Sequence, residues 1–193
     1  KSIKTFRSAL NYLDSLTNYE RLLRPGIGTP KMGLSRVQRI LAALGNPHRT
    51  YKTVHIVGTK GKGSTATMLA AMIRACGHRV GLYTSPHVLD ERERIMVDNG
   101  PISEPAFARA VAAVAAVTEK AKVPDPTYFE VLTAAAFRHF ADRKVDIAII
   151  EAGMGGRLDA TNVITPEAVG ITSISFDHMA QLGGTLEAIA REK

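Results

Sequence analysis

Residues 53–65 place an apolar segment directly before a glycine-rich turn that carries lysine and two hydroxyl side chains. Glycines allow backbone N–H groups to approach an anion closely, and a helix after the turn would add the positive end of its dipole. Lys62 can reach the outer phosphates of a nucleotide, and Ser64 or Thr65 can ligand Mg²⁺. We therefore expect ATP or GTP to bind where a strand at 53–57 meets a helix that begins near Ala66.

The spacing of this turn departs from the common phosphate-loop pattern, in which four residues separate the first glycine from Gly-Lys-Ser/Thr. Here two residues lie between Gly58 and Gly61, and Gly63 stands between Lys62 and Ser64. An ordinary glycine-rich turn on a basic protein is the alternative interpretation. The apolar strand before the turn and the helix after it favour the phosphate site.

The bulk composition is that of a globular α/β protein without disulfide bonds. The chain has 193 residues and a single cysteine, Cys76, so no internal disulfide can form. The sequence contains no apolar run of membrane-spanning length and does not begin with the long apolar region of a signal peptide. These features lead us to expect a cytoplasmic protein.

The formal charge of +7 indicates that the protein could bind an anionic partner. The lysines and arginines are dispersed along the chain, with no dense basic run and no aromatic-rich motif of an RNA-binding sheet. We therefore expect polyanionic small-molecule ligands rather than nucleic acid or a membrane.

Apolar periodicity predicts strands that alternate with helices along the chain. The predicted helices cover 3–16, 34–44, 66–76, 104–120, 127–142 and a segment from 184, and the predicted strands cover 53–57, 79–83, 145–150 and 168–173. This alternation is typical of a parallel sheet with helices on both faces. We expect residues 1–46 to form an N-terminal helical arm that packs on an ATPase domain at 47–193.

Polar residues follow the predicted strands, at the edge where ligands bind to sheets of this kind. Ser85 follows the second strand, Glu151 the third and His178 the fourth. A carboxylate at the end of an apolar strand beside a phosphate loop is a common direct or water-mediated ligand of Mg²⁺. The alternatives are a surface carboxylate for Glu151 and a hydrogen-bonded loop histidine for His178.

Six motifs in chain order together resemble the folylpolyglutamate synthase and dihydrofolate synthase family, in the Mur ligase superfamily. They lie at 59–65, 85–87, 91–95, 151–162, 177–183 and 191–193. The most specific is the block Gly-Gly-Arg-Leu-Asp-Ala-Thr-Asn at 155–162. The resemblance spans nearly the whole chain. It implies a P-loop NTPase-like α/β fold with a mostly parallel sheet, the Mur ligase central domain, here truncated and without the family's C-terminal α/β domain.

The resemblance also implies cofactors and the residues that hold them. The cofactors would be ATP and two Mg²⁺ ions, with the phosphates bound by Lys60, Gly61, Lys62, Gly63, Ser64 and Thr65. The metal ligands would be Ser64, Ser85, Glu151, His178 and Lys193. Lys193 matches a lysine that becomes carbamylated in this family, and the catalytic residues would be Lys62, His178 and Lys193. Taken alone, Lys193 would be an exposed lysine in the last turn of a helix.

A pterin site is a further implication of the resemblance. The matching segments are Lys31-Met32-Gly33, Thr127-Tyr128-Phe129-Glu130 and Leu158-Asp159-Ala160. Two of these residues have alternatives that need no ligand, since Glu130 can be structural and Asp159 can serve mainly as a loop-turn residue.

The activity that the resemblance implies is ATP-dependent addition of L-glutamate to dihydropteroate, to reduced folates, or to both, through an acyl phosphate. The family also suggests a monomer, and a fragment without the remaining part would be inactive alone. One alternative is a Mur-type ligase acting on a cell-wall nucleotide precursor, against which the pterin-type segments argue. Another is an ATPase that acts on nucleic acid, which the charge and the phosphate loop suggest.

Overall fold

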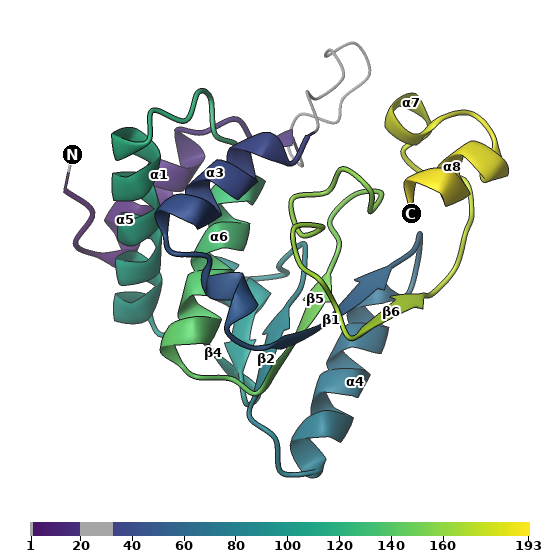
Figure 1. The fold of residues 1–193 in the computed structure, drawn as a ribbon, viewed down its shortest axis with the longest axis horizontal. Helices are drawn as coiled ribbons and strands as arrows, with labels where there is room; N and C mark the ends of the chain where they lie inside the picture. Colours follow the sequence, from purple (N-terminus) through teal and green to yellow (C-terminus); the bar gives the residue numbers. More distant parts are fainter. Residues whose placement is uncertain (1, 20–32) are drawn as a thin grey trace.

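The computed structural model describes residues 2–19 and 33–193 (Figure 1). Within these residues, six strands form one sheet in the order β4-β3-β2-β5-β1-β6. Four of them run parallel: β1 (Lys52–Val57), β2 (Val80–Tyr83), β5 (Ile147–Glu151) and β6 (Ala168–Ile171). The sheet confirms the predicted α/β class with a mostly parallel sheet.

Two short strands at one edge were not predicted. β3 (Ile95–Val97) pairs antiparallel with β2, and β4 (Gly100–Pro101) pairs antiparallel with β3. The turn between them has positive φ values at Asp98 (54°) and Asn99 (68°), which two-residue hairpin turns of type I′ require. These strands are too short to leave a clear alternating pattern in the sequence.

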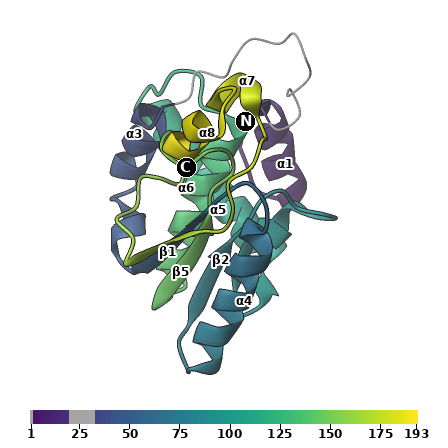
Figure 2. The same ribbon diagram turned by 90° about the vertical axis from the view of Figure 1, so that its right-hand side faces the viewer.

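Helices cover both faces of the sheet, as predicted (Figures 1 and 2). The helix α4 (Lys62–Ala75) lies on one face. The other face carries α1 (Phe6–Asp14), α3 (Ser35–Ala43), α5 (Glu104–Lys120) and α6 (Tyr128–Asp142). Successive residues of a strand point to opposite faces, and β5 divides accordingly: Ala148 and Ile150 join the larger hydrophobic cluster and Ile149 the one beneath α4.

The N-terminal helical arm shares its hydrophobic core with the helices that cover the sheet. Ala9 and Leu13 of α1 and Val37 and Ile40 of α3 are buried in the larger hydrophobic cluster. The Phe6 ring meets the Phe107 ring edge to face at 5.1 Å. This packing agrees with an arm that docks on the sheet layer, and the domain boundary at residue 46 stays a prediction.

Short elements complete the chain. They are the 3₁₀ turns at Pro47–Arg49 and Glu91–Arg94 and the helices α7 (Met179–Leu182) and α8 (Leu186–Glu192). Figure 1 places α7 and α8 at the carboxyl end of the parallel strands, beside the loop that follows β5. In the part of the chain that is described, no helix has the length and apolar character needed to cross a bilayer.

Candidate active site

The turn between β1 and α4 is built for close approach of a ligand to the backbone. The helix begins at Lys62 rather than near Ala66, because Gly61 adopts a left-handed conformation (φ 82°) as its N-cap. No side chain caps this helix end. The first N–H groups of a helix have no intrahelical partner, so those at 62–64 can bind an anion. The predicted phosphate residues therefore lie in the turn and in the first turn of α4.

A second segment holds this turn in place. The backbone N–H of Thr59 donates to the Ser173 carbonyl at 2.7 Å, and the N–H of Lys60 donates to Ser173 Oγ at 3.1 Å. A Cβ atom at Gly58 (φ 141°) would lie 2.0 Å from Thr172 Oγ1, so this position requires glycine. The supporting hydroxyl-rich segment 172–175 was not predicted as part of the site.

Glu151 lies at the carboxyl end of β5 and faces the start of α4. Its side chain is 4% exposed, and Oε2 accepts a hydrogen bond from the Ser85 backbone N–H at 3.1 Å. A Cβ atom at Gly63 would lie 3.4 Å from the same oxygen. Burial raises the pKa of Glu151, while the Ser85 N–H and the charge of Lys62 act in the opposite direction. The structure thus brings Ser85, Glu151 and the start of α4 together, as predicted.

Two lysines converge on the glycine-rich turn. Lys193 Nζ donates to the Gly58 carbonyl at 2.7 Å, and Lys62 Nζ donates to the Thr59 carbonyl at 3.4 Å. Burial lowers the pKa of Lys193, and the positive charge of Lys62 lowers it further. The last residue of the chain therefore lies at the site rather than in solvent.

The loop after β5 positions Lys193. The N–H of Arg157 donates to the Glu192 carbonyl at 2.8 Å, and the Arg157 guanidinium pairs with the Glu192 carboxylate at 2.7 Å. A Cβ atom at Gly156 would lie 2.8 Å from the Lys193 carbonyl oxygen. Only glycine permits this approach of the loop to the end of α8.

The side chain of His178 faces its neighbour Asp177. His178 is the N-cap of α7, and its Nε2 lies 3.7 Å from Asp177 Oδ2. Across residues 2–19 and 33–193, no three His, Cys, Asp or Glu side chains gather in an arrangement that could hold a metal ion. The donor set around Glu151 is oxygen-rich and small, which suits Mg²⁺, since this ion keeps several waters and binds through one or two carboxylates together with phosphates.

The predicted pterin segments are partly engaged in structure. Thr127 and Glu130 form a capping box at α6, and the Glu130 carboxylate accepts from Arg36 Nε at 2.9 and 3.0 Å. The ring of Phe129 packs against Gly153, where an added Cβ would lie 2.7 Å from it. Tyr128 is buried, with the Arg94 guanidinium 5.5 Å above its ring centre. The first turn of α6 and the loop after β5 therefore meet.

The other residues predicted to line a pterin site differ in burial. Leu158 is half-buried and Ala160 is buried in the large hydrophobic cluster. Gly33 is half-buried just before α3, and Lys31 and Met32 lie outside the described residues.

Asp159 is the centre of a buried hydrogen-bond network that was not predicted. Its carboxylate accepts from the N–H of Met154 at 2.9 Å, from the N–H of Thr161 at 2.9 Å and from the Thr161 hydroxyl at 2.5 Å. Thr161 Oγ1 lies 2.9 Å from Nε2 of His55 in β1. The network ties the loop to the central strand, which supports the structural alternative for Asp159.

Comparison with known proteins identifies the family of this fold. A model of the Mur ligase middle domain matches residues 56–193. The chain belongs to the Mur ligase middle domain family. In this Mur ligase middle domain, the matched residues include the phosphate turn, Glu151, the loop after β5 and both C-terminal helices.

Three relatives narrow the placement to the folylpolyglutamate synthase and dihydrofolate synthase family. The dihydrofolate synthase/folylpolyglutamate synthase of Bacillus subtilis is 42% identical over 167 residues, which cover 84% of this chain and 39% of the relative. The solved structure of an FPGS–AMPPCP–folate complex is 38% identical with a TM-score of 0.87, over 97% of this chain and 44% of that one. E. coli FolC in complex with DHPP and ADP is 34% identical with a TM-score of 0.86, over 100% and 44%.

The chain matches only part of the length of each of these relatives. This Mur ligase middle domain spans about two fifths of the Bacillus subtilis relative and 44% of the two solved chains. The relatives include an enzyme named for both activities and structures that hold a nucleotide together with a folate or DHPP.

Proposed function

We propose that this chain is the phosphate- and magnesium-binding part of an ATP-dependent ligase that adds L-glutamate to dihydropteroate, to reduced folates, or to both. The observation that carries the proposal is the convergence of Lys62, Lys193 and the Glu151–Ser85 pair on one glycine-rich turn. Relatives of the same fold are named for these activities and hold AMPPCP or ADP. The dispersed basic charge needs no nucleic acid or membrane partner, and we expect a monomer.

The phosphates bind at the turn and the first turn of α4. The uncapped N–H groups of this helix, together with Lys60 and Lys62, offset the negative charge of the nucleotide; Gly61, Gly63, Ser64 and Thr65 complete this segment. Lys62 already lies over the turn, since its Nζ bonds to the Thr59 carbonyl. It can exchange this neutral acceptor for a phosphate oxygen, because hydrogen bonds between ionised partners are stronger.

Glu151 would hold Mg²⁺, with Ser64 and Ser85 as neutral oxygen ligands. Its buried carboxylate receives one backbone hydrogen bond from Ser85 and faces the uncapped helix end, so a cation there would offset the cost of burying its charge. Mg²⁺ bound by these residues would supply positive charge that offsets the repulsion between the two anionic reactants. We propose His178 for the second ion, which requires its side chain to leave Asp177.

Lys193 would act as a carbamate. Its lowered pKa increases the fraction of neutral amine, and the neutral nitrogen attacks CO₂, forms the N–C bond and releases a proton. The product carries a negative charge, which Lys62 attracts and a free ammonium would not. This change would convert two like charges at the turn into a complementary pair.

The acid substrate would lie between α6 and the loop after β5. Phe129, packed on Gly153, offers a ring face beside the metal-binding end of β5. Thr127 and Glu130 would shape this site through the helix cap rather than through direct contact. Tyr128 lies beneath Arg94. Leu158 and Ala160 belong to the loop, which Asp159 ties to β1 through Thr161. Lys31, Met32 and Gly33 precede α3 in the chain.

Glutamate-dependent ADP release tests the proposal, measured on the full-length protein that carries this sequence. Dihydropteroate and tetrahydrofolate are supplied separately, and Lys62→Ala serves as the blank. We expect release that requires both glutamate and one of the two pterin acids. Release with dihydropteroate alone indicates a dihydrofolate synthase, with tetrahydrofolate alone a polyglutamylase, and with either a bifunctional enzyme. Release that depends on neither acid would overturn the folate assignment.

A further inference from the structure

A second polar pocket lies at the opposite end of the sheet from the phosphate turn. Val97 pairs with Gly81 at the beginning of β2, and Arg143 follows α6 just before β5 begins. Between these elements and the start of α5 is a pocket of about 620 Å³. Glu151 and Ser85 lie at the carboxyl ends of the same strands, so the pocket is separate from the candidate active site.

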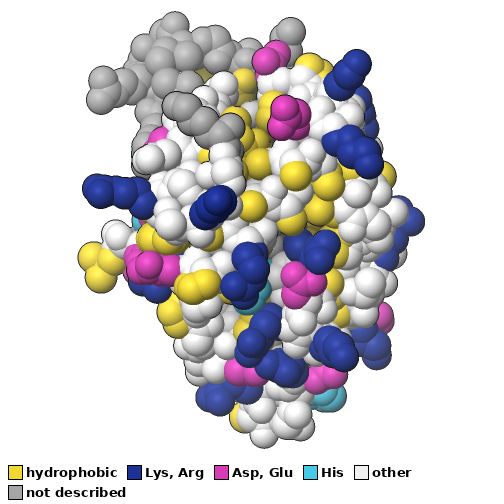
Figure 3. All heavy atoms as spheres, turned by 90° about the vertical axis from the view of Figure 1, so that its left-hand side faces the viewer, with side chains coloured by type: hydrophobic (Ala, Val, Ile, Leu, Met, Phe, Trp, Pro, Cys, Tyr) yellow, Lys and Arg dark blue, Asp and Glu magenta, His cyan; other side chains and the backbone are white. Residues whose placement is uncertain are grey.

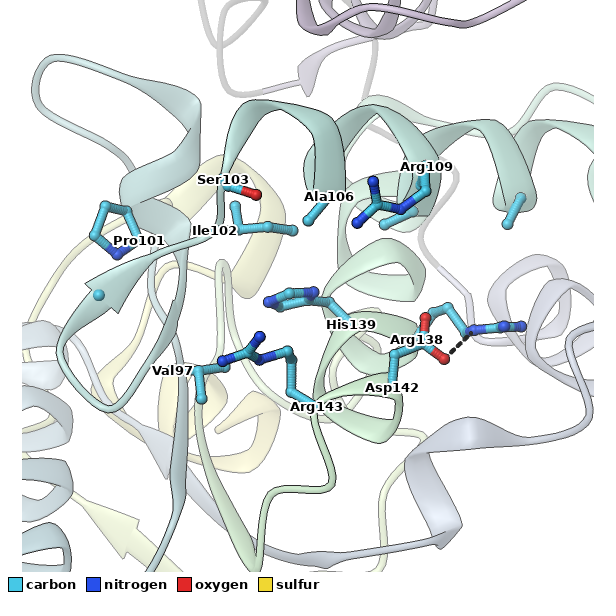
Figure 4. A pocket seen from close by; sticks show the side chains of 13 residues that line it. Val97, Pro101, Ile102, Ser103, Ala106, Arg109, Arg138, His139, Asp142 and Arg143 are labelled. Carbon is cyan, nitrogen blue, oxygen red and sulfur yellow. Dashed lines mark hydrogen bonds and ion pairs between the residues drawn. The ribbon is translucent and has the colours of Figure 1, made fainter.

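Basic side chains from two helices line this pocket (Figure 4). The guanidinium groups of Arg109 in α5 and Arg143 after α6 point toward the His139 ring from opposite sides. The Arg138 guanidinium is turned away and is paired with Asp142 at 2.8 Å. Within the described ranges, the guanidinium groups of Arg109 and Arg143 form no hydrogen bond or ion pair.

His139 makes this more than an exposed basic surface. The residue is only 8% exposed and lines the pocket, and its ring nitrogens form no hydrogen bond with the described residues. Burial lowers the pKa of His139 to about 4, with Arg143 and Arg109 acting in the same direction and Asp142 opposing them. The ring nitrogens remain accessible at the wall of the pocket, so an anion in the pocket could bind to them.

The surroundings favour an anion of small size. Ser103, the N-cap of α5, forms no side-chain capping bond, so its hydroxyl is available at the pocket edge beside a helix N-terminus. Figure 3 views the molecule from the α5 side and shows Lys and Arg side chains gathered over the lower half of that face, with a few Asp and Glu among them. The pocket is concave and of small-molecule size, unlike a groove for a polymer.

We propose that the pocket formed by Arg109, His139 and Arg143 binds a small phosphate-bearing ligand. Guanidinium groups recognise phosphate oxygens through paired N–H donors, and two of them facing one another can clamp a single phosphate. The His139 ring would supply a third donor once the anion has raised its pKa. The inference is independent of the proposed ligase function, since it uses none of the same residues.

The test titrates inorganic phosphate into ¹⁵N-histidine-labelled protein and follows the His139 ring by NMR. The Lys62→Ala background removes the phosphate turn as a competitor, and His139→Asn assigns the signal. We expect a saturable shift of the His139 ring nitrogens, with potassium chloride at equal ionic strength giving none. Arg109→Gln/Arg143→Gln should weaken this binding by on the order of 10-fold or more.

A charge-matched control separates specific binding from the general effect of positive charge. Arg7→Gln/Arg74→Gln removes two exposed arginines that do not line the pocket and should leave the phosphate affinity unchanged. The proposal is overturned if phosphate shifts nothing, if chloride gives the same shift, or if both double variants weaken binding equally. Failure here would leave the ADP-release test of the ligase function untouched.

Discussion

Replacing Thr161 by valine tests whether the buried network holds the loop after β5 on the central strand. Thr161 is fully buried, and its hydroxyl contacts both Asp159 and His55. A hydroxyl has one proton, which it donates to the Asp159 carboxylate, so it must accept from His55 Nε2–H. Burial lowers the pKa of His55 to about 4, which leaves the ring neutral at pH 7 with its proton on Nε2.

The magnitude follows from these contacts. Valine keeps the branched shape but removes a hydrogen bond to a charged group, which contributes about 1.5–3 kcal/mol. It also leaves the buried His55 N–H without a partner, which costs about 1–3 kcal/mol. The backbone N–H of Thr161 still donates to Asp159 in the variant. We therefore expect a loss of about 3–6 kcal/mol in the free energy of unfolding.

Urea unfolding monitored by circular dichroism measures this loss, and the chain offers a matched control. Thr118 is 5% exposed, and its hydroxyl donates within α5 to the Val114 carbonyl at 2.8 Å. Thr118→Val removes a bond to a carbonyl that the helix already satisfies, so its cost should stay below about 1 kcal/mol. Equal costs for the Thr161 and Thr118 variants would refute the assigned role of the network.

Three further predictions concern pH, charge and close packing. Burial holds the pKa of His55 at about 4, below its ordinary 6.5. The contribution of the neutral ring to stability is therefore full above pH 6.5 and is lost as the pH falls toward 4. His55→Gln should flatten the dependence of the free energy of unfolding on pH in that range, measured by urea denaturation. Burial raises the pKa of Glu151, so ionisation of this buried carboxyl group destabilises the folded protein. Glu151→Gln should therefore raise the melting temperature of the nucleotide-free protein and abolish its stabilisation by Mg²⁺. A lower melting temperature would contradict this. Gly156→Ala should cost about 1–3 kcal/mol in urea unfolding by displacing Lys193, whereas Gly184→Ala, where an added Cβ meets no atom within 4 Å, should cost less than about 1 kcal/mol.

Local signals account for the elements that the sequence predicted well. The helix at 104–120 was predicted with the bounds that α5 has, since an alanine- and valine-rich run begins there after Ser103 with proline in its first turn. The helix predicted from Thr127 begins at Tyr128, because Thr127 is its N-cap. The strand predicted at 145–150 is β5 at 147–151, shifted so that Glu151 is its last residue.

Contacts between distant segments explain what the sequence did not reveal. Thr59 and Ser173 are joined by a backbone hydrogen bond, and Arg36 and Glu130 by an ion pair, yet neither pair follows a local spacing rule. The earlier start of α4 depends on the left-handed conformation of Gly61, which glycine permits but does not dictate. A helix predicted from apolar periodicity alone begins at the first apolar residue, Ala66, and therefore leaves out the polar first turn of α4.

Among the site residues, the ends of the strands were the most predictable. Parallel strands place their carboxyl ends at one edge, so Ser85 and Glu151 were expected at the same edge of the sheet. The pairing of β2 with β5, which the sequence did not predict, makes them neighbours. The position of His178 depends instead on the path of the chain after β6, which sequence periodicity does not describe. The resemblance to relatives supplied its proposed role, which requires the His178 side chain to leave Asp177.

Calorimetric binding of a non-hydrolysable ATP analogue to this chain, with and without Mg²⁺, tests the central claim most directly. Lys62→Ala removes the ammonium over the glycine-rich turn, and Lys52→Ala, at the opposite end of β1, is the matched control. We predict Mg²⁺-dependent binding that weakens by about 10- to 100-fold in Lys62→Ala and is unchanged in Lys52→Ala. Binding that is equally tight in both variants, or that ignores Mg²⁺, would contradict a phosphate site at this turn.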